Sequence, residues 1–579
     1  MILQALARYY DDLLQQGKIS APGWTKVKIS YALDIGLDGQ LKQVIPTRQD
    51  ETVGKKTVQR PQEMVLPAPV KKASNISSNF LWENSGYLLG VKQKEDSKRS
   101  RKCFDNAREL HHRLLDSVDS SIAKAILAFF DRWQPENAAE HPALVGQLEE
   151  VTAGANLVFR VDGTYPQEDM LIRETWEHAQ NQEDRDATRM QCLITGREDE
   201  IAKIHPSIKG VRDAQSSGAA LVSFNAPAFC SYGHEQNYNA PVGKHAAFAY
   251  TAALNHLLSD RNSVQHIGDT TVVCWAEGAE EAYQNLAQFA LFGQEMPGLT
   301  DNDLRAALKR LANGLPCDDL GVDPKRAFYV LGLAPNAARL SVRFFLHDSF
   351  GKLMKNVNDH YDRMEIVRPS FDKQEILPLW LMLRETVNLN SRDKSPSPAM
   401  AGATVRAVFS GGPYPASLLE AVMLRIRAES SVTRGRAAII KAYYLKNPHS
   451  DCPKEVLTVS LNEASNNPAY VLGRLFSIYE NVQQAANRGI KATIKDKYFN
   501  SAAAMPASIF PVLNNLYQKH LRKLSPGLRK YFDNQVVELK SKLGESYPVR
   551  MTLAQQGAFD LGYYHQRNSK SNGEDQNND

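Results

Sequence analysis

The residues that most suggest catalysis are an adjacent histidine and aspartate, His347 and Asp348, in the stretch FFLHDSF. An imidazole beside a carboxylate can bind a divalent metal and support phosphoester hydrolysis, but a first-row metal needs further ligands in a defined geometry. An aspartate near the start of a helix is also typical of an N-cap. Five further histidines lack the H-x-x-x-H or H-E-x-x-H spacing of metal ligands: His205, His234, His245, His256 and His266. A metal-dependent phosphohydrolase site at this pair is therefore kept only as the alternative function.

Complete motifs of other enzyme classes are missing from the sequence. It contains no nucleophile elbow, no P-loop and no dinucleotide fingerprint. Its six cysteines form no C-x-x-C pair, and a chain of 579 residues does not depend on a disulfide framework. We therefore predict a protein that is not an enzyme and has no metal or cofactor, in a reducing cytoplasm.

A polar segment, SFNAPAFCSYGHEQNYNAPVG, is dense in amide and aromatic side chains. Amides and hydroxyls can hydrogen-bond base edges and sugars, so the segment is a candidate nucleic-acid surface. The same composition is typical of an ordered loop whose amides satisfy their own backbone. Both interpretations stay open for Asn225, Tyr232, Gln236, Asn237 and Asn239.

A strong local excess of positive charge lies near the C-terminus, although the whole chain carries a net charge of only +4. Between residues 474 and 530 there are only two acidic residues, Glu480 and Asp496. Solvated helix faces usually mix both signs to form i,i+4 pairs, so this imbalance favours a surface that binds phosphates. The basic residues are Arg474, Arg488, Lys491, Lys495, Lys497, Lys519, Arg522, Lys523, Arg529 and Lys530.

The elements that must position these residues follow from periodicity. Alternation around Val27 and Tyr31, with the turn LDGQ, predicts a β-hairpin, and residues 43–78 are expected to form long surface loops. Residues 99–133 are expected to be helical and packed. Short strands and helices are predicted for 151–280, a strand pair around APNA, and a helix over 350–364. Beyond this point, three-and-four spacing predicts a series of helices.

We expect an α+β fold with a mixed, β-containing N-terminal region at 1–150 and a central mixed α/β region at 151–456 that continues into helices. A C-terminal helical bundle is predicted at 457–568, and the tail 569–579 has no apolar content and is expected to be disordered. No apolar run reaches the length of a membrane span.

Seven segments, in matching order and spacing, resemble the large (Cas8c-type) subunit of type I-C CRISPR Cascade complexes. They are MILQALARYYDDL, SSNFLWENSGYLLG, SGAALVSFNAPAFCSYGHEQNYNAPVG, TAALNHLL with IGDTTVVCWAE, FSGGPYPASLLEAVMLRIRAE, NPAYVLGRLFSIYENVQ and FDLGYYHQR. The resemblance covers nearly the whole chain.

The resemblance implies a non-catalytic recognition subunit. In RNA-guided effectors the guide reads sequence by base pairing, while protein reads a short protospacer-adjacent motif (PAM) in double-stranded DNA. The implied partners are the guide crRNA, the target DNA, the backbone subunits, the subunit at the crRNA 5′ end, and a helicase-nuclease recruited after R-loop formation. A remaining possibility is an architectural bridge whose DNA contacts come from neighbouring subunits.

The resemblance also implies a small subunit, made by internal translation and equivalent to the C-terminal bundle. No methionine lies between Met423 and Met505, so an internal start just before NPAYVLGRLF would use a Val or Leu codon near Val456, Leu457 or Val459.

The resemblance does not supply the PAM-reading residues, which we infer physically from the segment KKASNISSNFLWENSGYLLG. Reading a duplex requires cations for phosphates and donors and acceptors for base edges. Residues 71–79 offer both, whereas 80–90, with Trp82 and Tyr87, are expected to be a packed anchor. The alternative is that 71–79 is a flexible linker. The proposed DNA-reading residues are Lys71, Lys72, Asn75, Ser77, Ser78 and Asn79.

Overall fold

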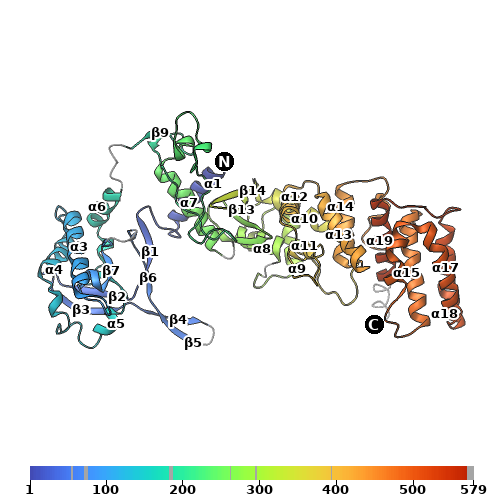
Figure 1. Cartoon of the computed structure of the whole chain (residues 1–579), viewed down its shortest axis with the longest axis horizontal. Coiled ribbons are helices and arrows are strands. Elements are labelled where there is room, and N and C mark those ends of the chain that lie inside the picture. Colours follow the sequence, from blue (N-terminus) through green and yellow to red (C-terminus); the bar gives the residue numbers. More distant parts are fainter. Residues whose placement is uncertain are drawn as a thin grey trace. The chain divides into compact units, whose positions relative to one another are not determined.

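The computed structural model describes residues 1–53, 56–70, 76–180, 187–260, 263–293, 296–392 and 394–569 (Figure 1). It divides the chain into two compact units. The N-terminal unit comprises Tyr10–His205 and Phe224–Ala252, and the C-terminal unit comprises Met1–Tyr9, Pro206–Ser223 and Ala253–Asp579. Helices α1 (Ile2–Gln15) and α7 (Lys244–Ser259) contribute residues to both units.

The N-terminal unit is built on a four-stranded sheet with the strand order β3-β2-β8-β7. β2 pairs antiparallel with β3 and parallel with β8. The hairpin predicted around LDGQ is confirmed as β2–β3. Gly39 in its turn has φ +80°, and a Cβ there would lie 2.5 Å from the Phe129 backbone nitrogen. The strands are β2 (Tyr31–Ile35), β3 (Leu41–Pro46), β7 (Trp82–Asn84) and β8 (Asn156–Val161).

Helices α3 (Ser97–Leu115) and α4 (Ser121–Arg132) supply much of the core of this unit. Phe129 and Phe130 both pack edge-on against Phe159 of the sheet, with ring centroids 5.4 and 5.5 Å apart. The predicted packing of Phe104, Ala107, Leu110, Leu114 and Val118 is confirmed. Smaller helices complete the unit: α2 (Ser85–Leu88), α5 (Leu148–Thr152) and α6 (Met170–Gln180).

The prediction of long loops over 43–78 is wrong for most of that segment. β6 (Gln62–Pro67) pairs with β1 (Trp24–Ile29), and β4 (Gln49–Val53) forms a hairpin with β5 (Lys56–Arg60). β6 pairs with β1 about forty residues earlier, a long-range contact that a local pattern does not show, whereas β4 and β5 form a local hairpin that the polar composition of the segment concealed. Within 151–280, where short strands were predicted, β9 (Arg189–Gln191) pairs with β10 (Glu198–Glu200).

The C-terminal unit begins with an antiparallel sheet in the order β11-β12-β13-β14. The strand pair predicted around APNA is confirmed as β13–β14, and the helix predicted over 350–364 is confirmed as α10. The strands are β11 (Val264–Ile267), β12 (Thr270–Ala276), β13 (Ala327–Asn336) and β14 (Arg339–Ser349). The helices that share one core with this sheet are α8 (Glu281–Phe292), α9 (Asp301–Ala312), α10 (Phe350–Met364), α11 (Leu379–Arg384), α12 (Pro398–Ser410), α13 (Ala416–Glu429) and α14 (Arg434–Lys446).

The last helices of the chain form a bundle whose centre is the pair α15 and α19 (Figure 1). Gly473 and Gly562 allow this close approach, since a Cβ on either would lie about 2 Å from a carbonyl oxygen of the facing helix. The helices are α15 (Pro468–Ala486), α16 (Ile494–Ala504), α17 (Pro506–Leu521), α18 (Pro526–Ser541) and α19 (Leu553–Asn568).

The predicted fold class is confirmed: strands and sheets occupy the N-terminal and central parts, and helices dominate the C-terminal half. The domain boundaries near residues 150 and 456 stay predictions, and residues 570–579 of the predicted tail lie outside the described residues. Across the ranges that the structure describes, no helix is both long and apolar enough to cross a membrane.

Candidate nucleic-acid interface

The basic residues of the bundle gather at one end of it. We call this the cationic end: the exposed side chains of Arg488, Lys491, Lys497, Lys519, Arg522, Lys523, Arg529 and Lys530. They come from the turn after α15, the start of α16, the end of α17 and the start of α18. Short connections between antiparallel helices bring these four places together.

Hydrogen bonds to uncharged groups connect the helix ends that form the cationic end. Lys523 Nζ donates to Asn487 Oδ1 (3.2 Å), and Asn487 Nδ2 lies 3.2 Å from His520 Nδ1, which joins the turn after α15 to the end of α17. Arg529 donates to the Arg522 carbonyl oxygen (3.0 Å), which joins α18 to α17. Burial and the nearby charge of Lys523 lower the pKa of His520.

The cations of this end have no acidic partners among the residues that the structure describes. None of the eight lies within 4.0 Å of a described carboxylate. Asp496 instead caps α16 by accepting from the Thr493 N–H (2.6 Å), so one of the two local acids is used inside the fold. The resulting surface carries positive charges that no described acidic side chain compensates, which is typical of phosphate-binding surfaces.

Arg474 and Lys495 differ from the rest of the predicted basic set. Arg474 is 4% exposed, and its Nε donates to Gln566 Oε1 (2.9 Å) within the bundle. Burial lowers the pKa of its guanidinium group. Arg474 therefore belongs to the interior, while the half-buried Lys495 lines a hollow beside α19.

The predicted DNA-reading loop is only partly described. Lys71, Lys72 and Asn75 lie outside the described residues. Ser77 is half-buried, whereas Ser78 and Asn79 are buried.

The described part of this loop is anchored to the fold. Asn79 Oδ1 accepts from the Val70 N–H (3.0 Å), and the Ser78 N–H donates to Asn106 Oδ1 (2.8 Å). Next to them, Phe80 stacks on Trp176 with ring centroids 5.4 Å apart, and Trp82 donates to the Pro67 carbonyl oxygen (2.8 Å). The polar atoms of Ser78 and Asn79 are thus used within the protein, and DNA contact stays a prediction for the loop.

In the polar segment, Asn239 holds the loop together. Its Oδ1 accepts from the Ser231 N–H (2.8 Å), and its Nδ2 donates to the carbonyl oxygens of His234 (3.0 Å) and Gln236 (2.9 Å). Asn237 is buried. For Asn239 the structure favours the ordered-loop interpretation.

Tyr232 and Asn225, in contrast, face solvent. Tyr232 is 98% exposed and has φ +54°, a left-handed conformation that is uncommon for a tyrosine. Gln236 also has a positive φ, +46°. The loop therefore presents the exposed ring of Tyr232 on a backbone that is fixed by internal hydrogen bonds.

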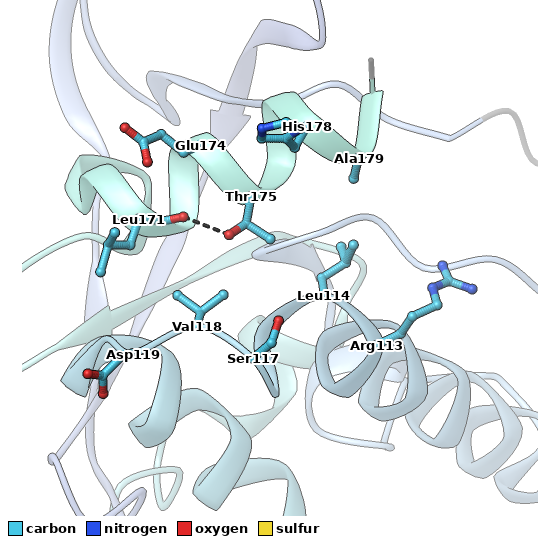
Figure 2. A pocket seen from close by; sticks show the side chains of 10 residues that line it. All are labelled: Arg113, Leu114, Ser117, Val118, Asp119, Leu171, Glu174, Thr175, His178 and Ala179. Atoms are coloured by element: carbon cyan, nitrogen blue, oxygen red, sulfur yellow. Dashed lines mark hydrogen bonds between the residues drawn. The ribbon is translucent and has the colours of Figure 1, made fainter. Parts of the chain in front are cut away.

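A hollow of about 480 Å³ lies in the N-terminal unit between α6 and the turn from α3 to α4 (Figure 2). Its floor is apolar, with Leu114, Val118 and Leu171, and its rim carries both signs of charge. Asp119 at the rim pairs with Lys124 (2.6 Å). This hollow contains none of the predicted site residues and has no excess of cations.

The alternative site at His347 and Asp348 gains no support. Both residues lie on β14, where successive side chains point to opposite faces. His347 stacks on Tyr329 (4.6 Å between centroids), and Asp348 pairs with Lys352 (3.2 Å). Within the described part of the chain, no group of three His, Cys, Asp or Glu side chains could hold a metal ion.

Comparison with known families decides the class of the protein. A family model described as CRISPR-associated protein (Cas_Csd1) matches residues 6–570. The chain belongs to the Cas_Csd1 family. The match spans both units and the cationic end, so it is not confined to one domain of this Cas_Csd1 protein. A comparison with curated proteins gave no match.

Proposed function

We propose that this Cas_Csd1 protein is the large (Cas8c-type) subunit of a type I-C Cascade complex in the cytoplasm. It is a non-catalytic subunit that recognises the PAM in double-stranded target DNA, promotes duplex opening and R-loop formation, and stabilises the displaced DNA. Its partners are the guide crRNA, the backbone subunits, the subunit at the crRNA 5′ end, an internally translated small subunit, and the helicase-nuclease that it helps recruit.

The observation that carries this proposal is the family match over residues 6–570. Two features support it. The ordered segments quoted above resemble the Cas8c-type subunit along the whole chain, and the cationic end offers exposed cations without described acidic partners, which suits a phosphate backbone.

The test is DNA binding by the assembled complex on a library of PAM sequences. N75A is expected to relax PAM preference, because an amide that reads a base edge gives discrimination of about 1–3 kcal/mol. K71A/K72A is expected to weaken all duplexes alike, because lysine contacts to phosphates carry no sequence information. N79A serves as a folding control, since Asn79 accepts a backbone hydrogen bond. Unchanged library profiles for N75A would contradict the assignment of the loop.

Crosslinking of DNA to the assembled complex separates this proposal from the architectural alternative. We expect crosslinked peptides from this subunit, in the loop 71–79 and in the cationic end. Crosslinks only to neighbouring subunits would show that the protein bridges them without reading DNA.

A further inference from the structure

A hollow of about 410 Å³ lies in the C-terminal unit beside the bundle. It is lined by residues of the segment 369–377, the start of α14, the start of α16 and the end of α19. This volume falls in the range of sites that bind small molecules or single residues of a polymer. Of all residues predicted to contact DNA, only Lys495 lines it.

The acidic residues that line this hollow are neutralised within the fold. Asp372 pairs with Arg434 (3.0 Å), and Glu385 accepts from the Thr433 hydroxyl (2.7 Å) and lies 3.4 Å from Arg436. Burial raises the pKa of Glu385, while the Thr433 hydrogen bond and the charge of Arg436 oppose this shift.

One cation of the hollow is not neutralised. Lys495 has no ion pair with any described carboxylate. Arg434, in contrast, is already engaged: besides its pair with Asp372, its guanidinium donates to the carbonyl oxygens of Gln374 and Glu375. A lysine with no carboxylate beside it can pair with a phosphate oxygen. The hollow therefore favours an anionic group.

An exposed aromatic ring adds a second binding feature. Phe371, which also lines the hollow, is 84% exposed, so its large apolar face meets water. Every nucleobase has a π-face that can stack on such a ring. Two further lining residues are held by hydrogen bonds: Tyr564 donates to the Val367 carbonyl oxygen (2.7 Å) and Tyr563 to Glu480 (2.7 Å).

The hollow and the cationic end both include residues at the start of α16. Thr493, just before α16, donates to the same Glu480 carboxylate (2.8 Å) that accepts from Tyr563. Lys495 is four residues from Lys491 and two from Lys497, both in the cationic end. A strand whose phosphates follow these lysines would thus reach the hollow.

We propose that this hollow binds one nucleotide of single-stranded DNA, with its phosphate at Lys495 and its base stacked on Phe371. The assignment to DNA rests on the proposed function. An RNA strand would offer the same phosphate and base chemistry, so the experiment includes it as a separate arm.

The test measures binding of fluorescein-labelled oligo(dT) to the full chain by anisotropy. F371A should weaken binding about 5- to 150-fold, because a stacked base contributes about 1–3 kcal/mol, and F371W should restore it. K495A should weaken binding and lower the salt slope by about 0.7, the value for one phosphate of a single strand. Controls are W380A, an aromatic side chain 49% exposed on α11, and K352A, an ion-paired lysine 65% exposed.

Photocrosslinking of an oligonucleotide with 5-iodouracil locates the base and should give a peptide containing Phe371. Affinities within twofold of the parent for both F371A and K495A would overturn the proposal, as would a crosslink elsewhere. Tighter, Phe371-dependent binding of oligo(U) would overturn the assignment to DNA. The PAM experiments test the proposed function separately. If they fail while oligo(dT) binding still depends on Phe371, the proposed function is wrong, but nucleotide binding in the hollow is supported.

Discussion

Two exposed regions of the C-terminal unit are rich in lysine but differ in how that charge is compensated. On α10, Lys352 pairs with Asp348 (3.2 Å) and Lys355 pairs with Asp359 (2.7 Å), both at i,i+4 spacing. At the cationic end, eight cations lie together with no ion pair to a described carboxylate. The difference teaches that exposure alone does not indicate a function for a lysine, because most surface cations are simply solvated beside an acid. The cations that lack such acids are the ones available to phosphates.

The largest effect is expected from reversing charge at the cationic end. K519E/R522E/K523E should weaken DNA binding by the assembled complex about 100-fold or more and prevent R-loop formation, because three phosphate contacts become repulsions. K352E/K355E is the matched control on α10 and should leave DNA binding unchanged. Gel-shift titration and permanganate footprinting measure binding and strand opening. Intact R-loops in the triple variant would contradict a DNA-binding role for this end.

The C-terminal unit also buries two histidine–tyrosine pairs, one between α10 and the segment just before α13, the other between the start of α15 and the end of α19. His360 Nδ1 lies 2.6 Å from the Tyr414 hydroxyl, and His565 Nδ1 lies 2.8 Å from the Tyr470 hydroxyl. Burial lowers the pKa of His360 to about 3 and of His565 to about 4. The folded state therefore binds fewer protons than the unfolded state, whose histidine pKa is about 6.5.

Stability should consequently be highest above pH 6.5 and fall as the pH drops from 6.5 toward 4, by about 2 kcal/mol per histidine at pH 5. Urea unfolding at pH 7.5 and 5.0 measures this. H360N and H565N should each reduce the pH dependence, although both lower stability at pH 7.5. Equal stability of the parent protein at the two pH values would contradict the prediction.

A designed ion pair would give one lysine of the cationic end an acidic partner, as the lysines of α10 have. Asn515 and Lys519 are exposed at i,i+4 on α17, so N515E should pair with Lys519 and stabilise the helix by about 0.3–0.5 kcal/mol. The same change should weaken DNA binding several-fold, because the new carboxylate competes with phosphate. In the reverse experiment, D359N frees Lys355 on α10 and should give no gain in DNA binding. Unaltered affinity of N515E would show that Lys519 does not contact DNA.

The smallest effect is the contribution of single lysines to salt dependence. K519A and K523A should each reduce the slope of log K against log salt by about 0.9 for duplex DNA, whereas K352A should not change it. Titrations at 50 to 200 mM salt measure the slopes. Equal slopes for K523A and K352A would remove the distinction between the two regions.

Much of the fold could be predicted from local patterns. Alternation on either side of LDGQ predicts the β2–β3 hairpin, and three-and-four spacing of apolar residues predicts α10 and the bundle helices. The pairing of β1 with β6 could not be predicted in this way, because the hydrogen bonds join strands some forty residues apart. The local β4–β5 hairpin was also missed, because its polar residues show no hydrophobic alternation.

For the site, sequence reasoning found the charge but not its arrangement. It grouped Arg474 with the exposed cations, although the close packing of α15 and α19 buries it. It also missed Phe371, Arg434 and Arg567, which line the hollow with Lys495. A lone phenylalanine in the polar stretch RPSFDK was the only local signal, and nothing in the sequence ties it to residues some 60 to 200 positions later.

The sequence by itself indicated the helices of the C-terminal half, the β2–β3 hairpin and the excess of positive charge over residues 474–530, because periodicity and composition are local properties, and it carries the family match. Only the tertiary structure decided which cations are exposed, which acids are already used, and which distant segments meet around a hollow. The physical reason is that solvation and pairing of a charge depend on its neighbours in space, which helix packing chooses after the helices themselves are specified.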